Sequence, residues 1–266
     1  MAPVHLQGGD GHAGMRRAVI VTGGSRGLGF AIAKRLAQQG DALALCGRDV
    51  EKLRSATDEL RGECGAEVYG ETLDVADGDI EGFIERSADA LGGVHGLVLC
   101  AGGASGGGLT ASTPQDWRRT YELNVGHPSR ALRSCLPYFG VSGGAVVLVS
   151  SISGWKPAPP AQYAAAKAAQ LSLAATWARE LGQYSVRINA LSPGSMLVPG
   201  GTWDRLRVAA PEAYAGFQQE FPARELVEVD EVAATARFLL SEEARGINGA
   251  NIPADRAQNA PTAFGY

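Results

Sequence analysis

The chain has 266 residues, of which 45% are hydrophobic and 20% charged, so it holds enough apolar material for one large core. Its 36 glycines and 13 prolines together make up about 18% of the chain, above the norm of about 12% but below the roughly 25% at which chains without a repeat are usually disordered. The net charge is −4 with no block of like charges, and a chain without a basic face is a poor partner for nucleic acid.

Glycine is frequent and apolar periodicity is absent at the start of the chain, so we expect a mobile tail over residues 1–16 and a single domain over 17–266. Short apolar runs predict strands over residues 18–22, 42–46, 67–73, 96–100, 145–150, 186–190 and 246–252. Helical spacing predicts helices over residues 27–39, 50–61, 77–91, 113–139, 161–182 and 229–240. Residues 195–222 carry turn signals and weak helical spacing, and we expect a substrate loop over the edge of the sheet.

The alternation of strands and helices determines the expected fold class. Strands that are apolar on both faces are typical of a parallel sheet covered by helices on each side. The sequence therefore predicts an α/β fold, a Rossmann-type doubly wound sheet of about seven parallel strands flanked by helices on both faces.

The first predicted strand runs into the turn Thr22-Gly23-Gly24-Ser25-Arg26-Gly27-Leu28-Gly29, after which a helix begins. Such a turn presents unpaired backbone N–H groups and the positive end of a helix dipole to an anion, and its glycines let a pyrophosphate approach. Glycine turns also have purely structural uses, but a position at the first strand-to-helix junction favours dinucleotide binding.

Tyr163 and Lys167 are four residues apart in an alanine-rich helical segment, so both project from one face of the helix. An ammonium group close to the phenol would lower its pKa toward neutrality, as a general acid or base requires. The pair alone would also fit an ordinary amphipathic helix. The preceding strand, however, ends in Ser150-Ser151, which offers a hydroxyl to a substrate carbonyl.

The pattern Thr-Gly-x-x-x-Gly-x-Gly from Thr22, combined with Tyr163-x-x-x-Lys167, resembles the short-chain dehydrogenase/reductase family, and the resemblance runs from residue 17 to 252. It implies a seven-stranded Rossmann-type sheet, NAD(H) or NADP(H) as cofactor, and often a tetramer. It also implies a catalytic set of Asn124, Ser151, Tyr163 and Lys167. In this set Tyr163 is the general acid or base, Lys167 also holds the nicotinamide ribose, and Asn124 holds a water for proton relay.

Two serines compete for the catalytic role. In relatives the serine is usually the second of a pair and thirteen residues before the tyrosine, whereas here Ser151 is twelve and Ser150 thirteen residues before Tyr163. The continuing Ser-x-x-Gly pattern from Ser151 to Gly154 favours Ser151, and Ser150 stays open.

The resemblance also implies which segments touch the cofactor. Asp74-Val75 after the third strand corresponds to the adenine contact, and Pro193-Gly194 after the sixth to the nicotinamide-flanking turn. The full expected set is Gly23, Ser25, Arg26, Gly27, Leu28, Gly29, Arg48, Asp74, Val75, Ala101, Gly102, Tyr163, Lys167, Pro193 and Gly194.

The end of the second strand decides between the two nucleotides. An NAD site usually has an acidic residue there for the ribose 2′-OH, whereas this chain reads Leu45-Cys46-Gly47-Arg48. Arg48 and Arg26 would bring two guanidinium groups to a 2′-phosphate, so we expect NADP(H).

Two segments depart from the family pattern. Leu99-Cys100-Ala101-Gly102 replaces the common Asn-Asn-Ala-Gly, which puts the rigidity of that turn in doubt. Pro253-Ala254-Asp255-Arg256 replaces Asp-Gly-Gly after the last strand, which leaves the packing of the C-terminal segment open.

We therefore expect an NADPH-dependent ketoreductase, or the corresponding alcohol dehydrogenase, acting on a small, apolar carbonyl or alcohol compound. Candidate substrate contacts are residues 102–109, Trp155, Pro157 and 195–203. An enoyl reductase is disfavoured because those relatives space the tyrosine and lysine farther apart. A silent NADP(H)-binding regulator is disfavoured by the intact catalytic set.

The sequence also allows predictions of the cellular location and the oligomeric state, from weaker signals. No apolar run approaches the roughly 18 residues of a membrane span, and no signal peptide is evident, so we expect a cytoplasmic protein. The four cysteines, Cys46, Cys64, Cys100 and Cys135, lack zinc-ligand spacing and are interpreted as buried thiols, with no metal site. The predicted helices that carry Asn124 and Tyr163 contain many small residues, and the family resemblance implies that these helices pair across subunits, so we expect a homotetramer, with a homodimer next.

Overall fold

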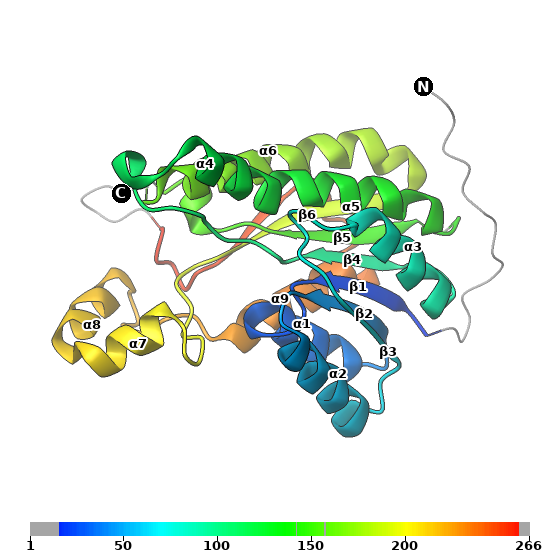
Figure 1. The fold of residues 1–266 in the computed structure, drawn as a ribbon, viewed down its shortest axis with the longest axis horizontal. Coiled ribbons are helices and arrows are strands. Elements are labelled where there is room, and N and C mark those ends of the chain that lie inside the picture. The colour runs from blue at the N-terminus through cyan, green and yellow to red at the C-terminus, as the bar shows by residue number, and fades with distance from the viewer. Residues whose placement is uncertain (1–15, 142, 157, 261–266) are drawn as a thin grey trace.

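A computed structural model describes residues 16–141, 143–156 and 158–260. Seven parallel strands form one sheet in the order β3-β2-β1-β4-β5-β6-β7 (Figure 1). The strands are β1 (Ala18–Thr22), β2 (Ala42–Gly47), β3 (Val68–Thr72), β4 (Gly96–Leu99), β5 (Gly144–Val149), β6 (Val186–Pro193) and β7 (Asn251–Ala254). The predicted Rossmann-type fold is confirmed, although β7 lies several residues later than expected. The tail expected over residues 1–16 lies, apart from Arg16, outside the described residues.

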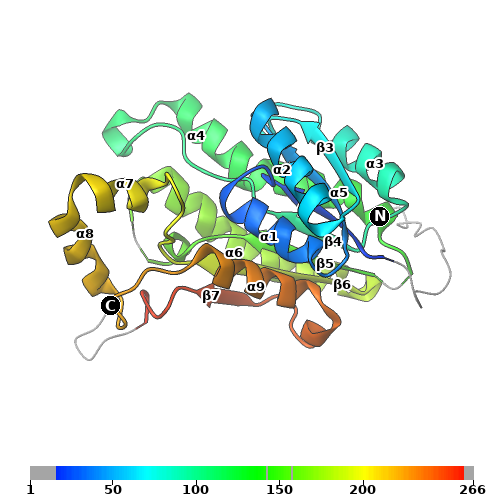
Figure 2. The same cartoon turned by 90° about the horizontal axis from the view of Figure 1, so that it is seen from below.

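Helices cover both faces of this sheet (Figures 1 and 2). Their bounds are α1 (Gly27–Ala37), α2 (Val50–Cys64), α3 (Ile80–Leu91), α4 (Pro114–Tyr121), α5 (His127–Cys135), α6 (Ala161–Leu181), α7 (Thr202–Ala209), α8 (Pro211–Phe217) and α9 (Val229–Leu240). On one side lie α1, α2 and α9, and on the other α3, α4, α5 and α6. No helix in the described ranges is both long and apolar enough to cross a membrane.

The five inner strands are largely buried because they contribute side chains to cores on both faces of the sheet, whereas the edge strands β3 and β7 keep exposed residues. In β1, Val19 and Val21 pack in the cluster that contains α1 and α9, whereas Ile20 packs in the cluster that contains α3. Successive side chains of a strand point to opposite faces, so a strand covered on both sides must be apolar throughout. This explains why the continuous apolar runs predicted the strands well.

The order of the strands reverses between β1 and β4. From β1 the chain builds outward through β2 and β3, then returns to place β4 on the other side of β1. The loops after β1 and β4 therefore diverge at the carboxyl edge, which is where doubly wound folds bind ligands.

The single helix predicted over residues 113–139 is interrupted. Between α4 and α5 lies a π-helical segment, Glu122–Gly126, two residues before Pro128. Pro128 has no N–H to donate to the carbonyl of Asn124, four residues earlier. The amide of Gln170 in α6 donates to that carbonyl instead, at 2.7 Å. The break therefore depends on a contact with a distant helix.

Residues 195–222 contain two helices, α7 and α8, rather than only a loop. Neither helix has a buried residue, and both project beyond the edge of the sheet in Figures 1 and 2. They are joined by the stacked rings of Trp203 and Phe217, whose centroids are 3.7 Å apart. Only a few partly buried side chains of these helices, Trp203, Tyr214 and Phe217, pack against the core, so the two helices leave only a weak periodic signal in the sequence.

Candidate functional site

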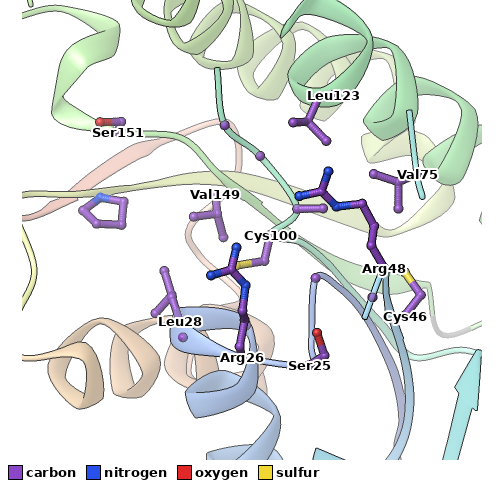
Figure 3. Close-up of a pocket in the computed structure, with 18 of the residues that line it drawn as sticks. Ser25, Arg26, Leu28, Cys46, Arg48, Val75, Cys100, Leu123, Val149 and Ser151 are labelled. Carbon is purple, nitrogen blue, oxygen red and sulfur yellow. The ribbon is translucent and has the colours of Figure 1, made fainter. Parts of the chain in front are cut away.

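A cavity of about 910 Å³ opens at the carboxyl edge of the sheet, beside the strand-order reversal (Figure 3). Its lining includes every predicted cofactor residue and Ser151. These are Gly23, Ser25, Arg26, Gly27, Leu28, Gly29, Arg48, Asp74, Val75, Ala101, Gly102, Ser151, Tyr163, Lys167, Pro193 and Gly194. Asn124 is fully buried and lies behind this lining.

The glycine turn between β1 and α1 has little room for side chains. Gly23 has a φ of +70°, and a Cβ there would lie 3.1 Å from the backbone of Ala101. A Cβ on Gly29 would lie only 2.2 Å from the carbonyl oxygen of Gly23. These two positions therefore require glycine, which keeps the start of α1 close to the end of β1 and open to the cavity.

The N-terminus of α1 is suited to hold an anion. Its N-cap residue is Arg26, which makes no side-chain capping hydrogen bond, and the first turn contains no acidic residue. The first N–H groups of the helix therefore lack a side-chain acceptor at the positive end of the helix dipole. Backbone donors of this kind fit the pyrophosphate of a dinucleotide.

Two arginines border the cavity near the end of β2. Arg26 and Arg48 both extend toward it in Figure 3. The side chain of Arg48 is 61% exposed, and its Nη1 lies 3.8 Å from Oδ2 of Asp74. Ser25 lies against Gly47, where a Cβ would be 2.4 Å from Ser25 Oγ. Exposed guanidinium groups beside a hydroxyl fit a phosphate ester.

Asp74 is held as a carboxylate at this end of the cavity. Partial burial raises the pKa of Asp74, but the N–H of Ala76 and the guanidinium of Arg119 outweigh this and leave the pKa below its usual value. Arg119 Nη2 donates to Asp74 at 2.7 Å. Asp74 is therefore shared between Arg119, which donates a hydrogen bond to it, and Arg48, which lies 3.8 Å away.

Asp49 and Lys52 also line the cavity, although neither was predicted. Asp49 caps α2 by accepting a hydrogen bond from the backbone N–H of Lys52 at 3.1 Å. Asp49 directly follows Arg48 in the chain, and an acidic residue at the predicted start of a helix was the signal that could have indicated it.

The two candidate serines have different surroundings. Ser150 is buried, and its Oγ donates to the carbonyl of Lys167 at 3.0 Å. Ser151 is half-buried and forms a side-chain hydrogen bond with Tyr163. Of the pair, Ser151 is therefore the hydroxyl that lies beside the phenol, and Ser150 fastens the end of β5 to α6.

Burial dominates the protonation of Tyr163. It raises the pKa of this phenol above its usual value, and the hydrogen bond with Ser151 acts in the opposite direction but is outweighed. The structure therefore differs from the predicted lowering of this pKa by Lys167. Burial of the phenol, which sequence spacing does not show, is the reason.

Lys167 is turned toward the backbone of β5. Its Nζ donates to the carbonyl of Val149 at 2.8 Å and lies 5.5 Å from the centre of the Tyr163 ring. The side chain is only 3% exposed, and burial lowers the pKa of Lys167 to about 8. A lysine in this environment can change its protonation near neutral pH.

Asn124 holds a loop, and its polar side-chain atoms all have protein partners. Its Nδ2 donates to the carbonyls of Gly103 and Thr120, each at 2.7 Å, and its Oδ1 accepts from the N–H of Gly103 at 3.3 Å. Its backbone carbonyl accepts from Gln170. The side chain of Asn124 therefore fixes Gly103, toward which the π-helical segment turns it, and its role in holding a water for proton relay stays a prediction.

Gly102 is where the loop, Asn124 and Lys167 meet. A Cβ on Gly102 would lie 3.0 Å from Asn124 Oδ1 and 3.2 Å from Lys167 Nζ. Any side chain at this position would therefore push against both polar groups. The absence of a side chain keeps Lys167 and Asn124 close to the floor of the cavity.

Thr22 takes over the support of the turn after β4, where the usual asparagine pair is missing. Its Oγ1 accepts hydrogen bonds from the N–H groups of Cys100 and Ala101, at 3.1 and 3.2 Å. His127 lies 3.4 Å from the same oxygen, and burial lowers the pKa of His127 to about 3, so its ring is neutral. The turn is thus held by Thr22, which His127 contacts in turn, and neither side chain was predicted to act here.

The cysteines are less uniformly buried than expected. Cys46 and Cys135 are buried, whereas Cys64 and Cys100 are half-buried, so the prediction of four buried thiols is wrong for two of them. Cys46 and Cys100 border the cavity in Figure 3. Their places follow from the ends of β2 and β4, which meet the cavity from either side of β1.

Comparisons with known proteins agree with this geometry. A sequence profile of the family described as "Enoyl-(Acyl carrier protein) reductase" matches residues 23–256. The human protein named dehydrogenase/reductase SDR family member 2, mitochondrial, is 32% identical over 239 residues, which cover 89% of this chain and 84% of that protein.

Solved structures are also similar. L-sorbose reductase from Gluconobacter frateurii, complexed with NADPH and L-sorbose, superposes with a TM-score of 0.84 at 27% identity, over 93% of this chain and 98% of that one. A variant of actinorhodin polyketide ketoreductase with NADPH gives a TM-score of 0.84 at 25% identity, over 92% and 98% of the two chains.

Proposed function

Because the chain belongs to the short-chain dehydrogenase/reductase family, we propose that it is an NADP(H)-dependent oxidoreductase that interconverts a ketone and a secondary alcohol. The observation that carries the proposal is that Ser151, Tyr163 and Lys167 lie together on the wall of the cavity, with Lys167 Nζ 5.5 Å from the centre of the Tyr163 ring. A phenol, a hydroxyl and an amine around one space are the groups that proton transfer to a carbonyl oxygen needs.

The choice of NADP(H) rests on charge at the end of β2. The uncapped start of α1 would hold the pyrophosphate, and Arg26 and Arg48 would hold the 2′-phosphate. When bound, the cofactor supplies or accepts the hydride. The similar reductase structures that contain NADPH support this choice.

Each catalytic side chain has a role in the reduction direction. The raised pKa of Tyr163 keeps its phenol protonated near neutral pH, so it can give its proton to the oxygen of the reacting carbonyl. Ser151 would donate a hydrogen bond to that same oxygen and hold it near the phenol. Lys167, with a pKa of about 8, would return a proton toward Tyr163 after the transfer, and Asn124 would act through the loop at Gly103.

The substrate is proposed to be a small and mainly apolar carbonyl or alcohol compound. Met196 lines the cavity on the side toward α7, and Trp155 is 36% exposed after the serines. Apolar side chains with a few polar groups at one end are typical of such sites.

The experiment is an assay of NADPH oxidation with a panel of ketones, using Tyr163→Phe as the matched variant. We expect wild type to turn over at least one ketone and the variant to lose turnover by roughly 100-fold or more while still binding NADPH. Binding of NADPH without turnover across a broad panel would favour a silent regulator. Equal turnover by the variant would remove Tyr163 from the mechanism.

The serine assignment is tested in the same assay. Ser151→Ala should lower the turnover number by roughly 100-fold with little loss of stability, because its hydroxyl lies beside the phenol. Ser150→Ala should mainly lower stability, since its hydroxyl is bonded to the Lys167 carbonyl. Equal, mild effects on turnover would refute both assignments.

A further inference from the structure

The turn that follows β7 has a backbone conformation that residues with a Cβ rarely adopt. Arg256 and Ala257 have φ angles of 48° and 61°. Left-handed backbone of this kind persists outside glycine only where the surroundings hold it in place, and it gathers at functional sites. The turn replaces the Asp-Gly-Gly segment common in the family and has no glycine at these two positions. The contacts of its own residues must therefore hold the left-handed backbone in place.

Side chains fix this turn from both ends. The carboxylate of Asp255 accepts from the N–H groups of Ala257 and Asn259, at 3.0 and 3.2 Å. The guanidinium of Arg256 pairs with Glu225 and Glu231 at 2.9 and 2.8 Å. The strained backbone is thus held by at least four polar contacts.

The result of the turn is that Gln258 points inward. Its side chain is buried, with the residue only 7% exposed. Its Oε1 accepts from the N–H of Ser195 at 2.8 Å, and its Nε2 donates to Ser195 Oγ at 3.1 Å. Ser195 directly follows Pro193 and Gly194, which line the cavity. Gln258 therefore holds the Pro193–Gly194–Ser195 turn by hydrogen bonds at one side of the site.

Gly194 shows how closely the two segments approach. A Cβ at this glycine would lie 2.8 Å from Asp255 Cβ and 2.9 Å from Gln258 Oε1. The N–H of Gly194 also donates to the carbonyl of Ala254 at 3.0 Å. The position of the Pro193–Gly194 backbone is therefore set by the segment after β7.

The same amide reaches a second segment. Nε2 of Gln258 donates to Oε2 of Glu220, just after α8, at 3.0 Å. Glu220 in turn pairs at 3.1 Å with Lys156, in the segment that follows Ser150 and Ser151 at the end of β5. In both Figures 1 and 2 the end of the described chain approaches α8. Gln258 and Glu220 thus connect the three segments around the substrate side of the cavity.

We propose that Gln258 is a positioning residue for the reaction, which sets the Pro193–Gly194–Ser195 turn and anchors the α7–α8 segment through Glu220. It touches neither the reacting atoms nor Tyr163, so its effect passes through the two segments it holds. The proposal rests on the proposed function for its kinetic consequence, but the tethering of the two segments does not depend on turnover.

The experiment compares Gln258→Leu with wild type by hydrogen exchange and by kinetics. In the variant we expect backbone exchange at residues 194–200 and 218–222 to become about tenfold faster, because both segments lose their tether. The KM for ketone should rise about tenfold while the turnover number at saturation changes less than about threefold. Gln183→Leu is the matched control, since the Gln183 amide only donates to Glu180 at the exposed end of α6.

A second variant separates tethering from folding. Gln258→Glu keeps an acceptor for Ser195 but places a carboxylate against Glu220, and adding Glu220→Gln restores a donor and an acceptor in exchanged positions. Rescue of exchange and KM in the double variant supports the proposal. Unchanged exchange in Gln258→Leu, effects equal to those of Gln183→Leu, or no rescue would overturn it. If wild type reduces no ketone, the proposed function fails and the exchange experiment alone decides this proposal.

Discussion

Arg48 illustrates how one side chain can set the choice of nucleotide. It lies at the mouth of the cavity, mostly exposed, and its one ion-pair partner among the described residues, Asp74, lies 3.8 Å away and is also paired with Arg119. Binding a phosphate at an exposed guanidinium has a small free-energy cost of desolvation, and the bidentate geometry of the guanidinium suits that ligand.

Arg48→Ala should therefore weaken NADPH binding by roughly tenfold to a hundredfold and leave NADH binding nearly unchanged. The dissociation constants are measured by fluorescence titration with both nucleotides. Arg54→Ala is the control, because Arg54 is exposed on α2 and pairs with Glu51. Tighter binding of NADH than NADPH by wild type would contradict the assignment.

Lys167 makes the free energy of unfolding rise with pH over part of the alkaline range. Its pKa in the folded protein is about 8, below its ordinary value of 10.5, because the charged form is buried. Between these two values the unfolded chain keeps the proton that the folded protein releases. The free energy of unfolding therefore rises with pH in this window, and the penalty for burying the charge is fully present below pH 8.

Compared with Lys167→Met, wild type should gain about 2 kcal/mol in the free energy of unfolding between pH 7 and 10. Urea denaturation of both proteins at matched pH values measures this difference. Parallel pH profiles for the two proteins would mean that Lys167 keeps its ordinary pKa when folded.

At the scale of elements, the break between α4 and α5 organises the loop beneath the cavity. The π-helical segment turns Asn124 toward Gly103, and Gln170 takes the carbonyl that Pro128 leaves free. Asn124 can hold Gly103 because its amide has both a donor and an acceptor, which the backbone of one residue requires.

Asn124→Asp preserves the size of this side chain but replaces its donor by an acceptor that faces two carbonyls. We expect a loss of about 2 to 3 kcal/mol in stability at pH 7, and a smaller loss at pH 5, where protonation of the new carboxyl restores a donor. Thermal unfolding at the two pH values measures this. An equal loss at both pH values would show that the donor is not what matters.

The sequence predicts elements well where their pattern is local. The inner strands are continuous apolar runs, and the glycine turn is a contiguous string, so the sequence predicts both at nearly their true bounds, whereas the edge strand β7 begins five residues later than predicted. The break at Glu122–Gly126 depends on Gln170, and the turn after β4 depends on Thr22, both far away in the chain.

The positions of the catalytic residues could also be predicted, because their spacing is a local pattern. The direction of their pKa shifts could not be predicted from the sequence. The spacing of Tyr163 and Lys167 fixes their common helix face, whereas the burial that raises one pKa and lowers the other comes from the surrounding segments. Gln258 was missed because tertiary packing alone brings it to Ser195, beside the residues that line the cavity.

At the scale of the whole molecule, one face of α6 is left open to a partner. Ala161, Ala168, Ser172 and Ala175 are exposed and spaced so that they share a side of the helix. Small side chains let another helix approach closely, and exposed apolar patches of this kind mark interfaces. A homotetramer, with a homodimer next, stays our prediction.

Ala168→Arg should reduce the oligomer to smaller species, because a long charged side chain would be inserted where two helices meet. Light scattering on wild type and variant measures the mass. Val50→Arg, at an exposed position of α2, is the control and should leave the mass unchanged. A monomeric wild type would contradict both predicted assemblies.

The strained turn at Arg256 and Ala257 lies near the end of the chain, so the contacts that depend on it can form only late in synthesis. A ribosome produces the glycine turn and then β4, so the part that would hold the dinucleotide can assemble early in synthesis. The tether from Gln258 to Ser195 and Glu220 is made only after all of these segments. Vectorial synthesis thus makes the glycine turn and the end of β4 first, and the Pro193–Gly194 side of the cavity is fixed last.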